Sequence, residues 1–274
     1  MKGIKKFEGD KEKGSMRFGA SFEDQDVVKR YIHRAPYPDE VFCKIVDLAP
    51  ERRSMLDLGC GPGTIARRLA SQFERLTALD ASRAMLDLGR QLPNGKAANI
   101  HWMEGLAEHV TYVGYPYDII VAAESIHWMD HQYLFPKLCN LVTDAHIFAV
   151  VEGDEACQPP WQTEWEAFLA RWIRYATHRP YQPVGHEPFL RRYEEWVEVL
   201  GEQYFISKPI VQDVDHFIAC QHSRNTFAPS ALGSAMTAFD RELAELLGPY
   251  ATENKIEYIV KTRVTWGKIQ VNTL

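Results

Sequence analysis

The sequence Met55-Leu-Asp-Leu-Gly59-Cys-Gly61-Pro-Gly63-Thr64 decides the fold of this chain of 274 residues. Residues 54–58 are a short apolar run typical of a buried strand, and the run stops at three closely spaced glycines. From Thr64 onward, apolar residues recur at helical spacing. The stretch therefore predicts a strand, a tight turn and a helix whose first amide groups have no partner within the helix.

The same alternation of strand and helix extends on both sides of this stretch. Further apolar strand candidates are residues 76–79, 100–103, 118–123 and 146–151, with a helix at 82–90. Two short helices are expected within residues 22–48, separated by a turn at Pro36 and Pro38. Repeated alternation of this kind predicts an α/β fold with a parallel sheet covered by helices on both faces.

The amino-acid composition of the chain changes after Val151. Residues 152–203 are rich in aromatic and charged residues with four prolines, and we expect a mostly helical insertion there that covers the binding edge of the sheet as a lid. The alternative is that the spacing of its aromatic residues, beginning at Trp161 and Trp165, marks only the buried side of an amphipathic helix. Beyond it, β-structure is expected at 204–211 and 257–268, with a helix near 231–247.

Composition narrows the class of function. A net charge of −6, from 31 basic and 37 acidic residues, argues against a nucleic-acid partner, because phosphate binding needs clustered Lys and Arg. No apolar run of membrane-spanning or signal-peptide length occurs, so no membrane partner is expected. The five cysteines form no CxxC pair, which favours a reducing, cytoplasmic location. Residues 1–16 are expected to be a flexible tail, with a single domain over 17–274.

Two carboxylates flank the glycine turn in sequence. A dinucleotide site would use GxGxxG, but the spacing here is GxGxG, with Asp57 two residues before Gly59. Asp57 would repel a pyrophosphate and could instead accept hydrogen bonds from an ammonium group. Asp80 lies 21 residues after Gly59, where α/β folds place the carboxylate that binds ribose hydroxyls. The alternatives are a glycine turn without a ligand, and Asp80 as a cap of the helix near Ser82.

These motifs resemble those of the class I S-adenosylmethionine (SAM) dependent methyltransferases, whose first motif is an acid followed by GxGxG. Residues 118–130 resemble the fourth strand and following loop of the methyltransferase type 11 group, which includes the trans-aconitate and ubiquinone-pathway enzymes. The Tyr31-Ile-His-Arg34-Ala-Pro-Tyr37-Pro stretch resembles the Y-x-x-R-x-x-Y-P segment of many of the same enzymes. A packed helix followed by a proline turn is the alternative for this last segment.

The resemblance implies a Rossmann-like, seven-stranded and mostly parallel sheet of order 3-2-1-4-5-7-6, with an N-terminal helical cover and a helical insertion after the fifth strand. It implies SAM as cofactor and S-adenosylhomocysteine (SAH) as product. The reaction would be methyl transfer to an N, O or C nucleophile of a small organic molecule, with secondary metabolism as a candidate setting and a homodimer as a candidate assembly. The cofactor contacts it implies are Tyr31, Arg34, Asp57, Gly59, Cys60, Gly61, Gly63, Asp80, Ala81, Met85, Gly105, Leu106, Ala107 and Ala122.

Individual roles follow from the same resemblance. Arg34 would pair with the methionyl carboxylate, and Tyr31 or Tyr37 would close the site over the sulfonium. Ala81 and Met85 would line the adenine pocket. Family members often carry Asp at the position of Leu106, so a backbone contact would replace the usual contact to the adenine amino group here.

His127 is the candidate catalytic residue, because a neutral imidazole can act as a general base. A histidine that only hydrogen-bonds within its loop is the alternative. The candidate substrate contacts are Tyr37, His127, Trp128 and Trp161. His127 and His131 lie four residues apart with Asp130 between them, but no third ligand group is signalled, so no metal is expected.

Two other classes stay open on the sequence alone. A nicotinamide-dependent oxidoreductase would share the strand–turn–helix start and the Asp80 spacing. A SAM-binding regulatory relative would keep cofactor affinity without turnover.

Overall fold

The computed structural model describes residues 24–110, 114, 116–181 and 193–270. Seven strands form one sheet in the order β3-β2-β1-β4-β5-β9-β6. Strands β1 to β5 pair in parallel, and β9 runs antiparallel to both of its neighbours. The predicted order is confirmed, since β6 and β9 are the sixth and seventh strands of this sheet. The bounds are β1 (Ser54–Leu58), β2 (Arg75–Asp80), β3 (Ile100–Glu104), β4 (Tyr117–Ala123), β5 (Val142–Glu152), β6 (Val197–Ile206) and β9 (Lys261–Ile269).

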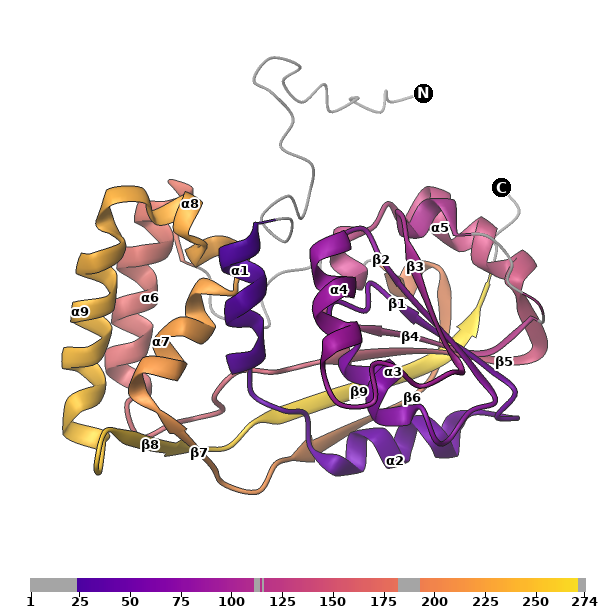
Figure 1. The fold of residues 1–274 in the computed structure, drawn as a ribbon, viewed down its shortest axis with the longest axis horizontal. Coiled ribbons are helices and arrows are strands. Elements are labelled where there is room, and N and C mark those ends of the chain that lie inside the picture. The colour runs from indigo at the N-terminus through magenta and orange to yellow at the C-terminus, as the bar shows by residue number, and fades with distance from the viewer. Residues whose placement is uncertain (1–23, 111–113, 115, 182–192, 271–274) are drawn as a thin grey trace, which may run out of the picture.

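Helices cover both faces of the sheet, as predicted. Successive side chains of a strand point to opposite faces, so Met55 packs in the apolar cluster of α2 and α3, while Leu56 and Leu58 pack in the cluster of α5. These two clusters form the core of the sheet region on the right of Figure 1. The helices are α2 (Asp39–Leu48), α3 (Thr64–Leu69), α4 (Arg83–Gln91) and α5 (His131–Leu138).

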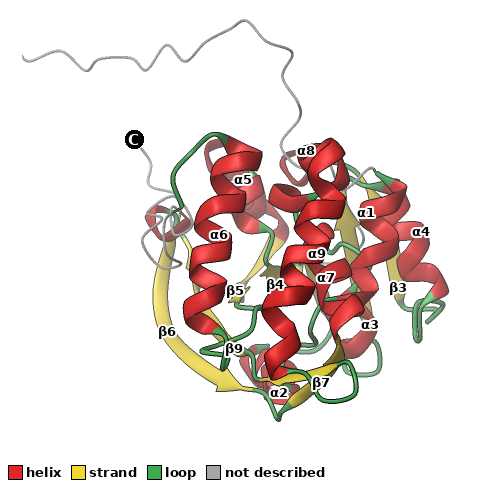
Figure 2. Cartoon of the chain, turned by 90° about the vertical axis from the view of Figure 1, so that its left-hand side faces the viewer, coloured by secondary structure: helices red, strands yellow, loops and turns green. Residues whose placement is uncertain are grey.

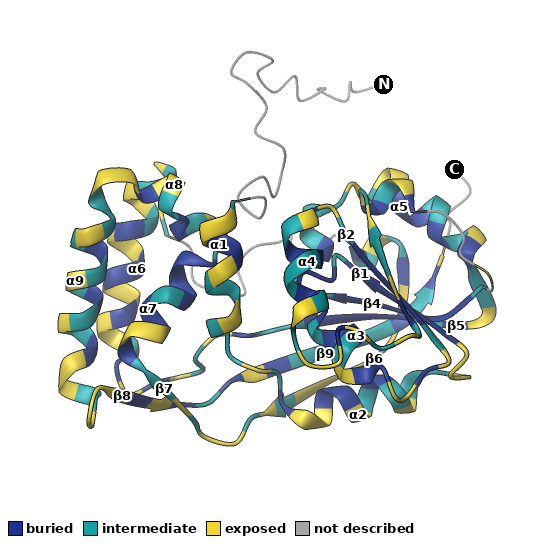
Figure 3. Cartoon of the chain, in the orientation of Figure 1, coloured by how far each residue is buried: buried dark blue, intermediate teal, exposed yellow. Residues whose placement is uncertain are grey.

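A separate group of helices lies at the carboxyl ends of β1, β2 and β4 (Figures 1 and 2). We call residues 154–181 and 207–258 the cap. Figure 3 shows that the cap helices bury their inner faces and expose their outer ones. The helix α1 (Gln25–Arg30) contacts both α7 of the cap and α4 of the sheet region. The cap contains α6 (Gln162–Thr177), α7 (Val214–His222), α8 (Pro229–Leu232), α9 (Met236–Leu247) and the antiparallel pair β7 (Ile210–Asp213) and β8 (Lys255–Tyr258).

Short 3₁₀ helices complete the connections. They are η2 (Tyr31–His33), η3 (Ala107–His109), η4 (Ile126–Trp128), η5 (Cys139–Leu141), η7 (Asn225–Phe227), η8 (Gly233–Ala235) and η9 (Gly248–Tyr250). Of these, η4 follows β4 and η7 follows α7, and both contribute residues to the cavity described below.

The predicted helical insertion over residues 152–203 is only partly correct. It contains α6, but residues 197–206 form β6 at the edge of the sheet, and residues 182–192 lie outside the described part of the chain. Most side chains of β6 are at least partly exposed, so the strand lacks the apolar alternation that would have marked it. The strand expected at 257–268 is also divided, because β8 leaves the main sheet to pair with β7.

The structure gives no support to the predicted substrate contact of Trp161, which lies outside the lining of the cavity described below. The side chain is 1% exposed and packs in the cap core against the rings of Phe217, Tyr250 and Tyr258. The alternative reading of the aromatic spacing holds for α6, where Trp165, Phe168 and Trp172 form the buried side of the helix. The expected tail at residues 1–16 lies outside the described residues.

Candidate functional site

The three glycines after β1 all adopt the left-handed backbone region, with φ of 68° at Gly59, 54° at Gly61 and 72° at Gly63. A Cβ on Gly59 would lie 2.6 Å from the Ser125 Cβ, and one on Gly63 would lie 2.4 Å from the Trp102 ring. At Gly61 the nearest atom is the Tyr31 hydroxyl, 3.5 Å away. Gly59 and Gly63 therefore permit close packing, while Gly61 leaves open space above the turn.

A cavity of about 1080 Å³ lies above this turn, between the carboxyl edge of the sheet and the cap. Its wall includes the turn, the ends of β2 and β4, the segment after β3 and residues 224–226 of the cap. The predicted residues that line it are Tyr31, Arg34, Gly59, Gly61, Asp80, Ala81, Met85, Gly105, Leu106, Ala107, His127 and Trp128. The predicted residues outside the lining are Asp57, Cys60, Gly63, Ala122, Tyr37 and Trp161.

Asp80 connects the glycine turn to the start of α4. One carboxylate oxygen accepts a 2.7 Å hydrogen bond from the Gly61 N–H, and the other accepts a 2.8 Å bond from the Ser82 N–H. Burial raises the pKa of Asp80, and the two amide donors act against that rise. The N-cap of α4 is Ser82, whose hydroxyl accepts from the Met85 N–H. Asp80 therefore shapes the turn and faces the cavity, and the capping role falls to Ser82.

Asp57 lies beneath the turn, where direct contact with an ammonium group was expected. Its side chain is 1% exposed, and one oxygen accepts a 2.9 Å hydrogen bond from the Ala66 N–H in the first turn of α3. The other oxygen is buried and has no partner among the described residues. Burial raises the pKa of Asp57 to about 7. The geometry makes Asp57 a support of the turn, because the carboxylate points toward α3.

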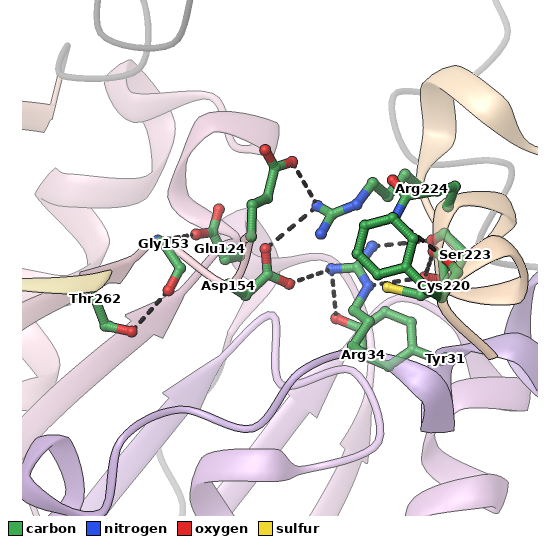
Figure 4. A network of polar contacts seen from close by, with 12 residues as sticks. Tyr31, Arg34, Glu124, Gly153, Asp154, Cys220, Ser223, Arg224 and Thr262 are labelled. Carbon is green, nitrogen blue, oxygen red and sulfur yellow. Dashed lines mark hydrogen bonds and ion pairs between the residues drawn. The ribbon is translucent and has the colours of Figure 1, made fainter. Parts of the chain in front are cut away.

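A polar network joins the sheet region to the cap over the cavity (Figure 4). The Arg34 Nε donates to the Ser223 hydroxyl at 3.0 Å, and Nη2 donates to the Ser223 carbonyl at 2.9 Å. The Nη1 atom lies 3.3 Å from both the Tyr31 hydroxyl and the Asp154 carboxylate. Most donors of Arg34 are therefore used within the protein, which leaves little of the guanidinium for a ligand carboxylate.

Asp154 is the centre of this network. Its second oxygen lies 3.2 Å from Nη1 of Arg224, and the same nitrogen lies 2.9 Å from Glu155. Burial by itself would raise the pKa of Asp154, but the guanidinium groups of Arg224 and Arg34 more than offset this and lower it. Asp154 is thus a buried, ionised link between two arginines from different parts of the chain.

Comparison with known proteins places this site in a family. The family model described as a methyltransferase domain matches residues 55–144, from the start of the glycine stretch into β5. The trans-aconitate 2-methyltransferase of Yersinia pseudotuberculosis is 27% identical over 192 residues, covering 63% of this chain and 69% of the relative. The chain belongs to the class I SAM-dependent methyltransferases.

Solved structures show that the fold is shared. A structure described as a type II methyltransferase of Anaeromyxobacter dehalogenans has a TM-score of 0.66 at 20% identity, covering 86% of this chain and 97% of the other. One described as a methyltransferase of Bacillus halodurans has a TM-score of 0.51 at 14% identity, covering 83% of this chain and 97% of the other. The sheet order of this methyltransferase is therefore found in proteins of very different sequence.

The cavity of the methyltransferase fits SAM, which supplies an electrophilic methyl group on a sulfonium. The space above Gly61 and the carboxylate of Asp80 lie on one wall, and Met85, Leu106 and Ala107 offer apolar surface for an adenine ring. The Tyr31 hydroxyl lies nearest to the open space at Gly61, and the Arg34 guanidinium lies over the Tyr31 ring. The individual cofactor contacts remain predictions that this arrangement supports.

His127 lines the cavity of the methyltransferase, with its ring 4.8 Å from that of Trp128. Burial, with the positive charge of Arg34, lowers the pKa of His127 to about 4. The imidazole is therefore neutral near pH 7 but a weak proton acceptor. His131 is not aimed at a shared ligand, since its Nε2 atom lies 2.9 Å from the Ile126 carbonyl. Among the described residues, no group of three His, Cys, Asp or Glu side chains could hold a metal ion.

Several cavity residues were missed by the sequence reasoning. Glu124, Glu155 and Arg224 line the cavity. Asp154 and Ser223 bind Arg34 over it. Glu124 could have been found from its position, because it follows directly after a central strand at the carboxyl edge. The others depend on how the cap packs, which no local pattern reveals.

Within the described part of the chain, none of the helices is both long enough and apolar enough to cross a membrane.

Proposed function

We propose that this methyltransferase transfers the SAM methyl group to an N, O or C nucleophile of a small organic molecule held between the end of β4 and the cap. One observation carries the proposal: a single cavity contains both the glycine turn with Asp80 and the cap residues 224–226. At about 1080 Å³, the cavity lies just above the usual range for sites that hold one small ligand. It has room for a cofactor and a compact acceptor.

The name of a relative supports a small acceptor. The name of the Yersinia relative gives a small organic acid, trans-aconitate, as the molecule it methylates. The acidic balance of the chain, with a net charge of −6, supports a dissolved metabolite over a nucleic acid or an anionic membrane surface. All five cysteines are free, which supports a reducing, cytoplasmic compartment.

The roles of the residues follow from their positions. Asp80 would bind the ribose hydroxyls of SAM, and Leu106 with Ala107 would flank the adenine. The cap residues 224–226 would cover the acceptor and exclude water, since they approach the cavity from the side opposite the sheet. Positioning and desolvation of this kind supply much of the rate increase for a reactive methyl donor.

Methyl transfer from labelled SAM to pooled small metabolites, with trans-aconitate among them, tests the proposal. We expect label in one small product, with SAH formed in equal amount, and no label in added DNA or RNA. The comparisons support neither a nicotinamide-dependent oxidoreductase nor a non-catalytic relative. Tight binding of NADH in place of SAM would favour the first, and SAM binding without any labelled product would favour the second.

A further inference from the structure

Glu124 occupies an unusual position at the wall of the cavity. It follows directly after β4 with a φ of 50°, a left-handed conformation that side chains other than Asn and Asp rarely adopt. Its N–H donates to the Val151 carbonyl at 2.9 Å, and its carboxylate accepts a hydrogen bond from the Gly153 N–H. Both the backbone and the side chain are thus fixed to the end of β5, which holds the strained conformation in place.

One oxygen of this carboxyl group is left for a ligand. The Gly153 N–H binds Oε1, and Oε2 has no hydrogen-bond partner among the described residues. Glu124 lines the cavity and precedes Ser125, whose side chain packs against Gly59 of the cofactor turn. Glu124 therefore belongs to the part of the cavity wall next to the turn that would hold the methyl donor. Figure 4 shows its carboxyl group beside Gly153.

The surrounding charges leave Glu124 without a dedicated cation. Arg34 is hydrogen-bonded to Ser223 and ion-paired with Asp154, and Arg224 is ion-paired with Asp154 and Glu155.

The pKa of Glu124 accordingly rises to about 8, first through burial and then through the neighbouring Asp154 carboxylate. The Gly153 N–H and Arg224 act against this rise, and Glu152 adds to it.

Two tyrosines of the N-terminal segment are close enough to feel the charge of Glu124. Burial raises the pKa of Tyr31 and of Tyr37, and the charge of Glu124 adds to both. Both hydroxyls therefore stay protonated and cannot take a proton near neutral pH. His127 also lines the cavity, but its pKa of about 4 makes it a weak acceptor, whereas Glu124 offers a carboxyl oxygen without a hydrogen-bond partner among the described residues.

We propose that Glu124 accepts the proton of the acceptor nucleophile, and that the acceptor is therefore a hydroxyl or amine compound instead of a carboxylate. The lone pair of the acceptor O or N forms a bond to the methyl carbon while the carbon–sulfur bond breaks. The sulfur keeps the electron pair and becomes the neutral thioether of SAH. The acceptor proton passes to Oε2 of Glu124 and from there to solvent.

The chemical class of the acceptor follows from the role of the Glu124 carboxyl group. A carboxylate acceptor has no proton to give, and it would be repelled by the Glu124 carboxyl group whenever that group is ionised. A neutral hydroxyl or amine meets no such repulsion. This inference rests on the proposed function, and it separates this chain from its relative named for trans-aconitate.

The first test needs no acceptor. SAM is positively charged at the sulfur and SAH is neutral there, while their other groups are the same. If Glu124 lies beside the transferred methyl group, its ionisation favours the positively charged SAM, so calorimetry between pH 6 and pH 9 should show the SAM-to-SAH affinity ratio rising by about 3- to 30-fold. The ratio should be constant with pH in Glu124→Gln, which can still accept from the Gly153 N–H.

The second test uses labelled SAM with a panel of alcohols, phenols, amines and carboxylic acids at matched size. We expect product from a hydroxyl or amine compound, and Glu124→Gln should lower kcat by about 10² to 10⁴-fold and remove an ionisation from the rate profile. The exposed Glu245→Gln on α9 is the matched control and should keep the rate of the wild type. Thermal unfolding of both variants checks that they are folded.

The outcomes separate the two proposals. A SAM-to-SAH ratio independent of pH in the wild type, or a carboxylate as the preferred acceptor, would overturn the role of Glu124 even with active enzyme. Absence of product from every small molecule would count against the proposed function, and the affinity ratio would then still decide whether Glu124 lies beside the methyl-donor site.

Discussion

The Arg34 guanidinium and the Asp154 carboxylate lie 3.3 Å apart, although 120 positions separate them in the chain. The side chains are 13% and 6% exposed, so the pair is largely shielded from water. The same arginine holds Ser223 at the end of α7. Through this ion pair and these hydrogen bonds, Arg34 connects the N-terminal segment to both segments of the cap over the cavity.

Replacing Asp154 with Asn should destabilise the protein strongly. The substitution leaves the Arg34 guanidinium buried without its carboxylate, which typically costs about 3 to 5 kcal/mol of the free energy of unfolding. Urea denaturation of Asp154→Asn measures this loss, with the exposed Asp47→Asn on α2 as the control. A loss no greater than that of the control would show that the ion pair does not hold the cap to the sheet.

The Asp57→Asn variant should gain stability relative to the wild type as the pH rises. The pKa of Asp57 is about 7 in the folded protein, above the usual value of an aspartate, so the folded state keeps a proton that the unfolded state releases. The wild type therefore loses stability as the pH rises toward 7, and the amide variant does not. Between pH 5 and pH 8, the difference in unfolding free energy should shift in favour of Asp57→Asn by on the order of 2 kcal/mol.

Urea denaturation at both pH values measures this shift. Equal differences at pH 5 and pH 8 would mean that Asp57 is ionised throughout, and that another positive group compensates its buried charge.

Asp80→Asn should bind SAH more weakly without unfolding. The amide oxygen can still accept from one backbone N–H of the turn, but the loss of charge removes a charged hydrogen bond to the ribose, with a cost of about 1 to 3 kcal/mol. Calorimetry with SAH measures this cost, and Asp47→Asn again serves as the control. Unchanged affinity would restrict Asp80 to shaping the Gly61 turn.

His127→Gln should have a limited effect on the pH profile. Because the pKa of His127 is lowered to about 4, its imidazole does not titrate between pH 6 and pH 9, and the rate profile in that range should keep its shape. The Michaelis constant of the acceptor should rise, since the ring lines the cavity. A fall in kcat of about 10² to 10⁴-fold with loss of an ionisation would instead make His127 the general base.

The parts of the fold that the sequence predicts are those with a local signal. The glycine stretch and the alternation around it predict β1 to β5 because strand and helix periods are visible within a few residues. The placement of Asp57 could also have been found: it lies two residues from Met55 on the same side of β1, which faces α3.

The polar network between Arg34, Asp154 and the cap could not be predicted in this way. Ser223 and Arg224 carry no local signal, because their partners Arg34 and Asp154 are distant in the chain and meet them only once the cap is packed. The strained backbone of Glu124 likewise depends on its fixation to β5, which the sequence does not encode locally.

Titration calorimetry of the purified chain with SAM and with SAH tests the central claim most directly. The account predicts one binding site per chain for each ligand, and a melting temperature that rises with SAH concentration because the ligand binds only the folded state. An absence of binding heat and of any thermal shift at millimolar concentrations of both ligands would contradict it.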